Sequence, residues 1–178
     1  MAELISWPED WPSQKTVDFL VVKAQNLFTY VATVIAFTGN PARNPAELLD
    51  WLVSTIPVPN SADYKAPFAD LDALYTFIFH YQADEILPGV IDLRKRLLHA
   101  IVLSGKDYCT LEELDEYLVL PPGSSDSLLS NLHSLIDVPS SSNDGSGRRK
   151  VWLKNKSIWD FLVSKERSGD LHQGGHIK

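Results

Sequence analysis

Apolar residues recur every three to four positions along most of this chain, which is the spacing of amphipathic helices. The first such run starts after Ser13, a residue type that caps helix N-termini, and it ends before Gly39 and Pro41. It predicts one long helix with a broad apolar stripe. The members of that stripe are Val17, Leu20, Val21, Ala24, Leu27, Phe28, Val31 and Ile35.

Two more helices are predicted in the first half of the chain. The Asn44-Pro45 pair is a helix cap followed by a proline on the first turn, and its helix ends before Pro57. The next helix is predicted over 68–82, with its apolar residues on one side. Beyond it, Pro88-Gly89 is the strongest candidate for a boundary, because both residue types interrupt regular structure.

Three helices are predicted after this junction. The helix that begins at Val90 directs the basic triplet 94–96 mostly outward. Residues 110–113, Thr-Leu-Glu-Glu, form a capping box for a short second helix. A third helix is predicted from Ser125 to about Leu135.

The pattern then changes from helix to strand. Short β-branched and aromatic runs at 135–138 and 151–153 flank a polar, Gly-rich segment, which is typical of a β-hairpin with a long tip. A last helix is predicted over 157–165. Three helices followed by a hairpin are the layout of a winged helix.

These elements predict an all-α protein with a small β-hairpin wing, made of a helical subdomain followed by a winged-helix-like subdomain. The N-terminal tail covers 1–12 and the helical subdomain 13–83. The winged-helix-like subdomain covers 90–169 and includes a mobile loop at 139–150. A frayed tail is predicted at 170–178, where glycines are frequent and no apolar pattern continues.

The charge distribution argues against a nucleic-acid partner. The 178 residues carry a formal net charge of −7, whereas phosphate backbones are bound mainly by Lys and Arg. The helix predicted at 125–135 would read DNA in a winged helix, yet it contains no Lys or Arg. We therefore expect no nucleic-acid binding.

The sequence also favours a cytoplasmic protein without a membrane partner. Cys109 is the single cysteine, so an intrachain disulfide is impossible, which suits a reducing compartment. The N-terminus lacks the basic start and apolar run of a signal peptide. The most apolar segment, 31–37, is far shorter than a membrane span.

Candidate chemical groups are few and isolated. Cys109 has no neighbouring histidine and is expected to be a structural thiol rather than a nucleophile. The pairs His172 and His176, and Asp70 and Asp72, lack a third metal ligand nearby. The acidic cluster at 112–116 is interpreted as a solvated helix face. We therefore expect no catalytic residue, no metal site and no cofactor, and hence a protein that is not an enzyme.

The order of six short motifs resembles the C-terminal, helical and winged-helix part of fungal NACHT-domain signalling NTPases of the STAND class. Each motif alone is leucine-rich and unspecific, but their order is specific, and the resemblance covers 11–172. The motifs lie at 11–33, 70–75, 97–103, 110–114, 132–136 and 156–162.

Two departures separate this chain from the complete family members. No Gly-x-x-x-x-Gly-Lys-Ser/Thr run is present, so the loop that cradles nucleotide phosphates is missing. Asn155 stands where the resemblance implies a nucleotide-sensing histidine. That makes Asn155 a weak candidate for nucleotide contact, although an asparagine directly before a helix is also a common cap.

The resemblance implies a regulatory module that couples conformational change to protein–protein contact. Its expected partner is a P-loop NTPase core supplied by another chain, or further copies of itself, and the chain is either a fragment or a stand-alone relative. A contiguous apolar patch is expected around Phe19–Phe28 and Trp152. Two alternatives remain: an adaptor that binds a peptide or helix in a groove, and a nucleic-acid-binding winged helix.

Overall fold

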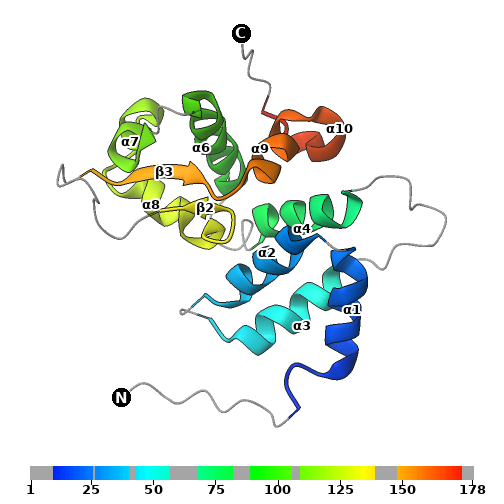
Figure 1. Ribbon diagram of the computed structural model, residues 1–178. Helices are drawn as coiled ribbons and strands as arrows, with labels where there is room; N and C mark the ends of the chain where they lie inside the picture. Colours follow the sequence, from blue (N-terminus) through cyan, green and yellow to red (C-terminus); the bar gives the residue numbers. More distant parts are fainter. Residues whose placement is uncertain are drawn as a thin grey trace, which may run out of the picture. The chain divides into compact units, whose positions relative to one another are not determined.

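The computed structural model is mostly helical, with a small antiparallel sheet of three strands within the described residues (Figure 1). This confirms the predicted fold class, all-α with a small β wing. The chain forms two compact units, 1–74 and 75–178, which divide inside helix α4 (Ala69–His80). The sequence had placed the division later, between 83 and 90. The structure describes residues 10–25, 27–40, 43–56, 68–81, 89–105, 109–138 and 148–173.

The first unit contains α1 (Gln14–Ala24), α2 (Phe28–Thr38), α3 (Pro45–Thr55) and the start of α4. The two predicted caps are confirmed. The Ser13 hydroxyl accepts a hydrogen bond from the backbone N–H of Thr16 at 3.2 Å. The side-chain oxygen Oδ1 of Asn44 accepts one from the backbone N–H of Ala46 at 3.0 Å. Helices α2 and α3 pack against each other (Figure 1).

The prediction of one long helix over 13–38 is wrong. The chain leaves the helix at Gln25, which adopts a left-handed conformation with φ 45°, and α2 starts three residues later. Helix α2 buries Tyr30, Val34 and Phe37. Because α2 is apolar on nearly all sides, its sequence period could not decide which face would be buried. Several residues of the predicted stripe are therefore exposed, among them Val21, Phe28, Val31 and Ile35.

A buried ion pair connects α1 with the start of α4. The Lys23 ammonium lies 2.7 Å from Asp70 Oδ1, and both side chains are almost entirely excluded from solvent. The Gln25 amide donates a hydrogen bond to the second Asp70 oxygen at 2.8 Å. The Tyr30 hydroxyl is also buried and has no hydrogen-bond partner among the described residues. Burial raises the pKa of Tyr30 far above its usual value, and the negative charge of Asp70 raises it further.

The second unit contains the predicted three helices and hairpin. The helices are α6 (Val90–Ser104), α7 (Leu111–Leu118) and α8 (Ser124–Leu129), and α8 continues into the 3-10 turn η2 (Ser130–Leu132). The predicted capping box is present, since Thr110 and Glu113 exchange backbone and side-chain hydrogen bonds. In Figure 1, α6, α7 and α8 lie around the short strands.

The sheet has the strand order β1-β3-β2, and both pairs are antiparallel. Strands β2 (Ile136–Asp137) and β3 (Lys150–Leu153) form the predicted hairpin. Strand β1 (Cys109–Thr110) was not predicted, because two residues beside a helix cap carry no strand pattern. Lys150 belongs to β3, so the predicted loop 139–150 is shorter than expected, and its part 139–147 lies outside the described residues.

Asp115 fixes the turn between α7 and α8. Its two carboxylate oxygens accept hydrogen bonds from the Gly123 amide at 2.6 Å and the Ser125 amide at 2.8 Å. Asp115 is only 6% exposed. The interpretation of the acidic cluster 112–116 as a solvated helix face is therefore wrong for Asp115. The α8 N-terminus is thus capped by a side chain from the preceding helix.

Arg94 is buried, contrary to the prediction that the basic triplet 94–96 points mostly outward. Its Nη1 donates to the carbonyl oxygens of Phe79 and Tyr81 at 3.2 and 3.1 Å. Its Nε donates to the carbonyl oxygen of Leu128 at 3.3 Å. Burial lowers the pKa of this guanidinium. Arg94 therefore ties the end of α4 to α8 through backbone acceptors.

The last elements that the structure describes are α9 (Lys156–Val163), α10 (Lys165–Ser168) and a 3-10 turn, η3 (Gly169–Leu171). The predicted frayed tail 170–178 is wrong in its first part. Leu171 and Gln173 are buried, and the backbone N–H of Gln173 donates to the Leu162 carbonyl oxygen at 2.8 Å. The rest of that tail, 174–178, lies outside the described residues.

Candidate functional site

Asn155, the candidate for nucleotide contact, caps helix α9. Its side-chain oxygen accepts a hydrogen bond from the Ile158 amide at 3.2 Å, and the Ser157 hydroxyl donates to the same oxygen. The capping interpretation is therefore confirmed. Contact between Asn155 and a nucleotide stays a prediction.

Tyr75 of α4 holds this cap in place. Its hydroxyl lies 2.6 Å from the Ser157 hydroxyl and 3.4 Å from the Asn155 oxygen. Its fully buried ring meets the ring of Phe161 edge-on, with 5.4 Å between the centroids. The Asn155 oxygen is thus occupied by protein donors, so the side-chain NH₂ is the group that remains for a ligand.

An apolar groove adjoins this cap, between the end of α6, strand β3 and the start of α9. It encloses a volume of about 540 Å³. The two indole side chains of Trp152 and Trp159 line it together with Leu103, which is 49% exposed. Asn155 and Lys156 add polar groups to the same groove. We call it the tryptophan groove.

The chemistry of the tryptophan groove suits a binding surface rather than a reaction. Its lining is mostly aliphatic and aromatic, and its one charged side chain, Lys156, lies 3.7 Å from Asp160 at the surface. Its described lining residues include no His, Cys, Ser, Asp or Glu side chain. Broad indole surfaces beside a few hydrogen-bonding groups are typical of sites that bind an apolar side chain of a partner.

The first unit also exposes apolar side chains on α1 and α2. Phe28, Val31 and Ile35 stand at positions i, i+3 and i+7, so they share one side of α2. Val21 and Val22 of α1 are 66% and 61% exposed. The name α1–α2 apolar face denotes these five exposed residues of two consecutive helices. Because α2 also buries its opposite side, it is apolar all round, which is typical of helices covered on both sides.

The remaining sequence candidates are Cys109, Asp70 and the two histidines of the C-terminal segment. Cys109 is half-buried in β1, and burial is the main influence that raises the pKa of its thiol, which disfavours the reactive thiolate. Asp70 is paired with Lys23. His172 is half-buried, and His176 lies outside the described residues. Among the described residues, no three His, Cys, Asp or Glu side chains gather in a geometry for a metal ion.

No helix in the described part of the chain combines the length and the apolar character needed to cross a bilayer. Comparisons with protein families, with curated proteins and with solved structures find no match to this chain.

Sequence reasoning named Trp152 and Asn155 but did not foresee that they share a groove with Leu103. Leu103 ends a helix nearly fifty residues earlier, and no local pattern links the two segments. Contacts of α6 with β3, together with the antiparallel pairing of β1 with β3, bring the end of α6 beside Trp152. The signal for this site is therefore tertiary.

Proposed function

We propose that this chain is a non-catalytic regulatory module that acts by docking onto another protein, as the C-terminal part of a NACHT-type signalling NTPase. The order of the six motifs supports the assignment. In the structure these motifs lie on α1 and the start of α2, on α4, on α6, on the start of α7, between the end of η2 and the start of β2, and on α9. The winged-helix layout of the second unit agrees with the same family architecture.

The observation that carries the docking role is the α1–α2 apolar face. Phe28 is 84% exposed and Ile35 is 64% exposed on a helix that lacks charged residues. Covering apolar surface with a partner contributes about 25 cal/mol of binding free energy for each Å² removed from water. Large apolar patches exposed at a protein surface mark sites of interaction with other proteins.

The proposed partner is a P-loop NTPase core, because this chain lacks the Gly-x-x-x-x-Gly-Lys-Ser/Thr loop that such a module would regulate. The role requires binding to differ between nucleotide states of the core, since a ligand shifts an equilibrium only through a difference in affinity. The module itself contributes surface rather than chemistry.

The test is binding to a NACHT-type P-loop core from the same genome, measured by biolayer interferometry with the core loaded with ADP or with a non-hydrolysable ATP analogue. We expect binding that differs between the two nucleotides. The double variant V22D/I35D should weaken it by at least about tenfold, because it places carboxylates in the α1–α2 apolar face.

The matched control is Lys15→Asp. It changes the net charge by the same amount at an exposed position of α1 outside the apolar face. This variant should bind like the unmodified chain. Equal weakening by both variants would reduce the effect to charge, and absence of binding in both nucleotide states would refute the proposal.

A second candidate function is an adaptor that binds an apolar peptide or helix, and the tryptophan groove favours it. Its volume of about 540 Å³ falls in the range of ligand-binding clefts. The two functions separate by variant: Leu103→Asp should abolish peptide binding in the groove and leave binding at the α1–α2 apolar face intact. Because the chain has five tryptophans, a change in indole fluorescence reports occupancy of the groove only if Trp152→Phe or Trp159→Phe removes it.

A further inference from the structure

A second cavity of about 490 Å³ lies in the second unit, between α6, α7 and the C-terminal segment. None of its lining residues lines the tryptophan groove. The cavity collects nitrogen-bearing side chains from separate parts of the chain. Helix α6 contributes Lys95, Arg96 and His99, and the segment after η3 contributes His172. We call it the basic cavity.

Three of these side chains have no acidic partner among the described residues. Arg96, His99 and His172 form no ion pair and no side-chain hydrogen bond within that part of the chain. Arg96 therefore keeps its formal positive charge without a described acidic partner, in a chain whose net charge is −7. An anionic ligand would satisfy all three groups at once.

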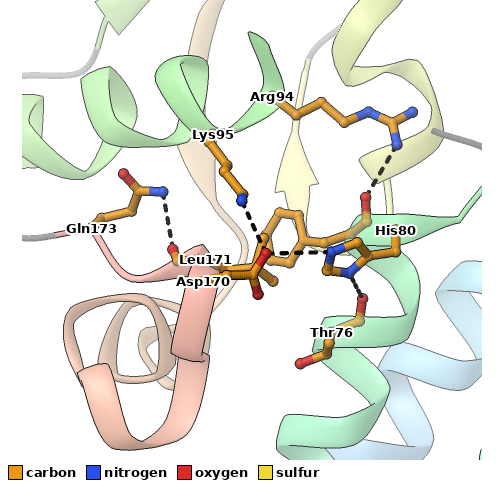
Figure 2. Close-up of polar contacts among 8 residues, drawn as sticks. Thr76, His80, Arg94, Lys95, Asp170, Leu171 and Gln173 are labelled. Atoms are coloured by element: carbon orange, nitrogen blue, oxygen red, sulfur yellow. Dashed lines mark hydrogen bonds and ion pairs between the residues drawn. The ribbon is translucent and has the colours of Figure 1, made fainter. Parts of the chain in front are cut away.

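The carboxylate of Asp170 is the one acidic group among the lining residues described. Figure 2 shows it between two nitrogen-bearing side chains: Lys95 Nζ lies 2.9 Å away and His80 Nε2 lies 3.8 Å away. The hydrogen bond from Lys95 is the main influence that lowers the pKa of Asp170. Asp170 thus neutralises Lys95 and leaves the other basic groups of the cavity unmatched.

The other lining residues can contact the organic part of a ligand. Tyr117 is 65% exposed and Leu118 is buried next to it on α7. Gln173 is buried, and its Nε2 donates to the Leu171 carbonyl at 3.0 Å, which fixes the side chain (Figure 2). The volume is much larger than a phosphate ion and lies in the range of sites for small organic ligands.

We propose that the basic cavity binds a phosphomonoester, with Arg96, His99 and His172 around the phosphate and Tyr117 beside the organic group. The planar guanidinium of Arg96 presents paired N–H donors that match phosphate oxygens. Imidazole nitrogens donate further hydrogen bonds to the same oxygens. The ligand is either a free small molecule or a phosphorylated side chain of a protein, and both present the same chemical group.

The test is a titration followed by ¹⁵N–¹H NMR of the full chain. The probes are O-phosphoserine, a phosphoserine peptide with the same peptide unphosphorylated, and inorganic phosphate. We expect saturable shifts of the amides of 95–99, 117 and 170–173 with the phosphorylated probes. Tighter binding of the peptide than of O-phosphoserine would identify a protein as the source, and the reverse order would identify a small molecule.

Two variants with opposite expected effects make the test specific. R96Q/H99Q should weaken phosphoserine binding by about tenfold or more, because neutral amides replace the charged guanidinium with its paired donors and the imidazole ring. D170N should strengthen it by about threefold to tenfold, because it removes the acid of the cavity and releases Lys95. The matched controls K165Q and E166Q alter exposed charges on α10 outside the cavity and should change nothing.

The proposal is overturned if phosphorylated probes cause no saturable shift, if the unphosphorylated peptide binds equally well, or if R96Q/H99Q binds as the unmodified chain does. It stands independently of the docking role, because no residue of the α1–α2 apolar face or the tryptophan groove takes part. Failure of one proposal therefore leaves the other unaffected.

Discussion

The ammonium of Lys23 and the carboxylate of Asp70 form a 2.7 Å ion pair from which water is excluded. The pair joins residues 47 positions apart, and Gln25 completes it with a hydrogen bond to the second carboxylate oxygen. The Lys23 ammonium also lies 5.6 Å from the centre of the Phe19 ring. Burying both charges is unfavourable, so their mutual attraction must offset the lost hydration.

We expect that removing one partner destabilises the first unit far more than removing both. Lys23→Met should lower the free energy of unfolding by about 3–5 kcal/mol, because it leaves the Asp70 carboxylate buried without its cation. The double variant K23M/D70N should recover much of that loss. Urea denaturation followed by circular dichroism measures both, and a double variant no more stable than Lys23→Met alone would contradict the argument.

Two buried tyrosines provide a matched comparison. Both Tyr30 and Tyr75 are fully excluded from solvent, but the Tyr30 hydroxyl has no partner in the described structure, whereas the Tyr75 hydroxyl bonds Ser157 at 2.6 Å. Tyr30→Phe should leave stability unchanged or raise it by up to about 1 kcal/mol, because it removes an unsatisfied polar group.

Tyr75→Phe should lower stability by about 1 kcal/mol, since it leaves the partner hydroxyl of Ser157 with one bond fewer. The two variants remove the same atom, so their difference isolates the hydrogen bond. Denaturation midpoints measured under identical conditions give the comparison. A larger loss for Tyr30→Phe than for Tyr75→Phe would show that the Tyr30 hydroxyl is satisfied in solution.

Asp115 should be the most sensitive acidic residue of the winged-helix-like unit. Asp115→Ala removes the acceptor for the Gly123 and Ser125 amides and is expected to lower the free energy of unfolding by about 2 kcal/mol. Asp115→Asn should give an intermediate loss, because it retains one acceptor oxygen but directs an NH₂ group at one amide. The neighbouring exposed Glu116 is the control, and Glu116→Gln should stay within about 0.5 kcal/mol of the unmodified chain.

The contact between Lys95 and Asp170 predicts a small effect that depends on pH. The pKa of Asp170 in the folded protein lies below its usual value of 3.8, so its carboxylate stabilises the fold at neutral pH. That contribution is lost as pH falls through the lowered pKa. Asp170→Asn should therefore reduce stability by less than about 1 kcal/mol at pH 7, because the pair is exposed, and the difference should vanish in strong acid. Equal effects at both pH values would contradict the assignment.

Helix caps were predictable from sequence because their donors and acceptors lie within three residues. Ser13, Asn44 and Thr110 each lie two or three residues before the backbone N–H group that donates a hydrogen bond to their side chain. The structure confirms all three predicted caps. Asn155 follows the same rule at the start of α9. Its second set of contacts, with Tyr75, joins residues 80 positions apart and has no sequence signature.

The buried charges were harder to foresee, although part of the signal was present. Arg94 lies four residues after Val90 and three before Leu97, so it falls on the buried stripe of α6. Lys23 similarly precedes Ala24 on the buried side of α1. A charged residue at such a position can either extend to the surface or find buried acceptors, and only the tertiary structure decides between these outcomes.

The basic cavity and the tryptophan groove could not be predicted at all, because each joins segments far apart in the chain. In the sequence, nothing distinguishes Arg96 and His99 from other polar positions of α6. Only the folded structure places Asp170 and His172 in the same cavity. The sequence pattern predicts a frayed tail at 170–178, which includes Asp170 and His172. The buried Leu171 explains why the first part of that tail is not frayed, since one apolar side chain anchors the surrounding polar residues.

Asp115 of α7 caps the N-terminus of α8. The number of residues between Asp115 and Gly123 is therefore fixed by the reach of its carboxylate. Val119 and Gly123 both take left-handed conformations to return the chain to Asp115 within eight residues. Inserting or deleting a single residue there would move the amides out of reach of their acceptor. Related chains should therefore keep this spacing constant even where other connections vary in length.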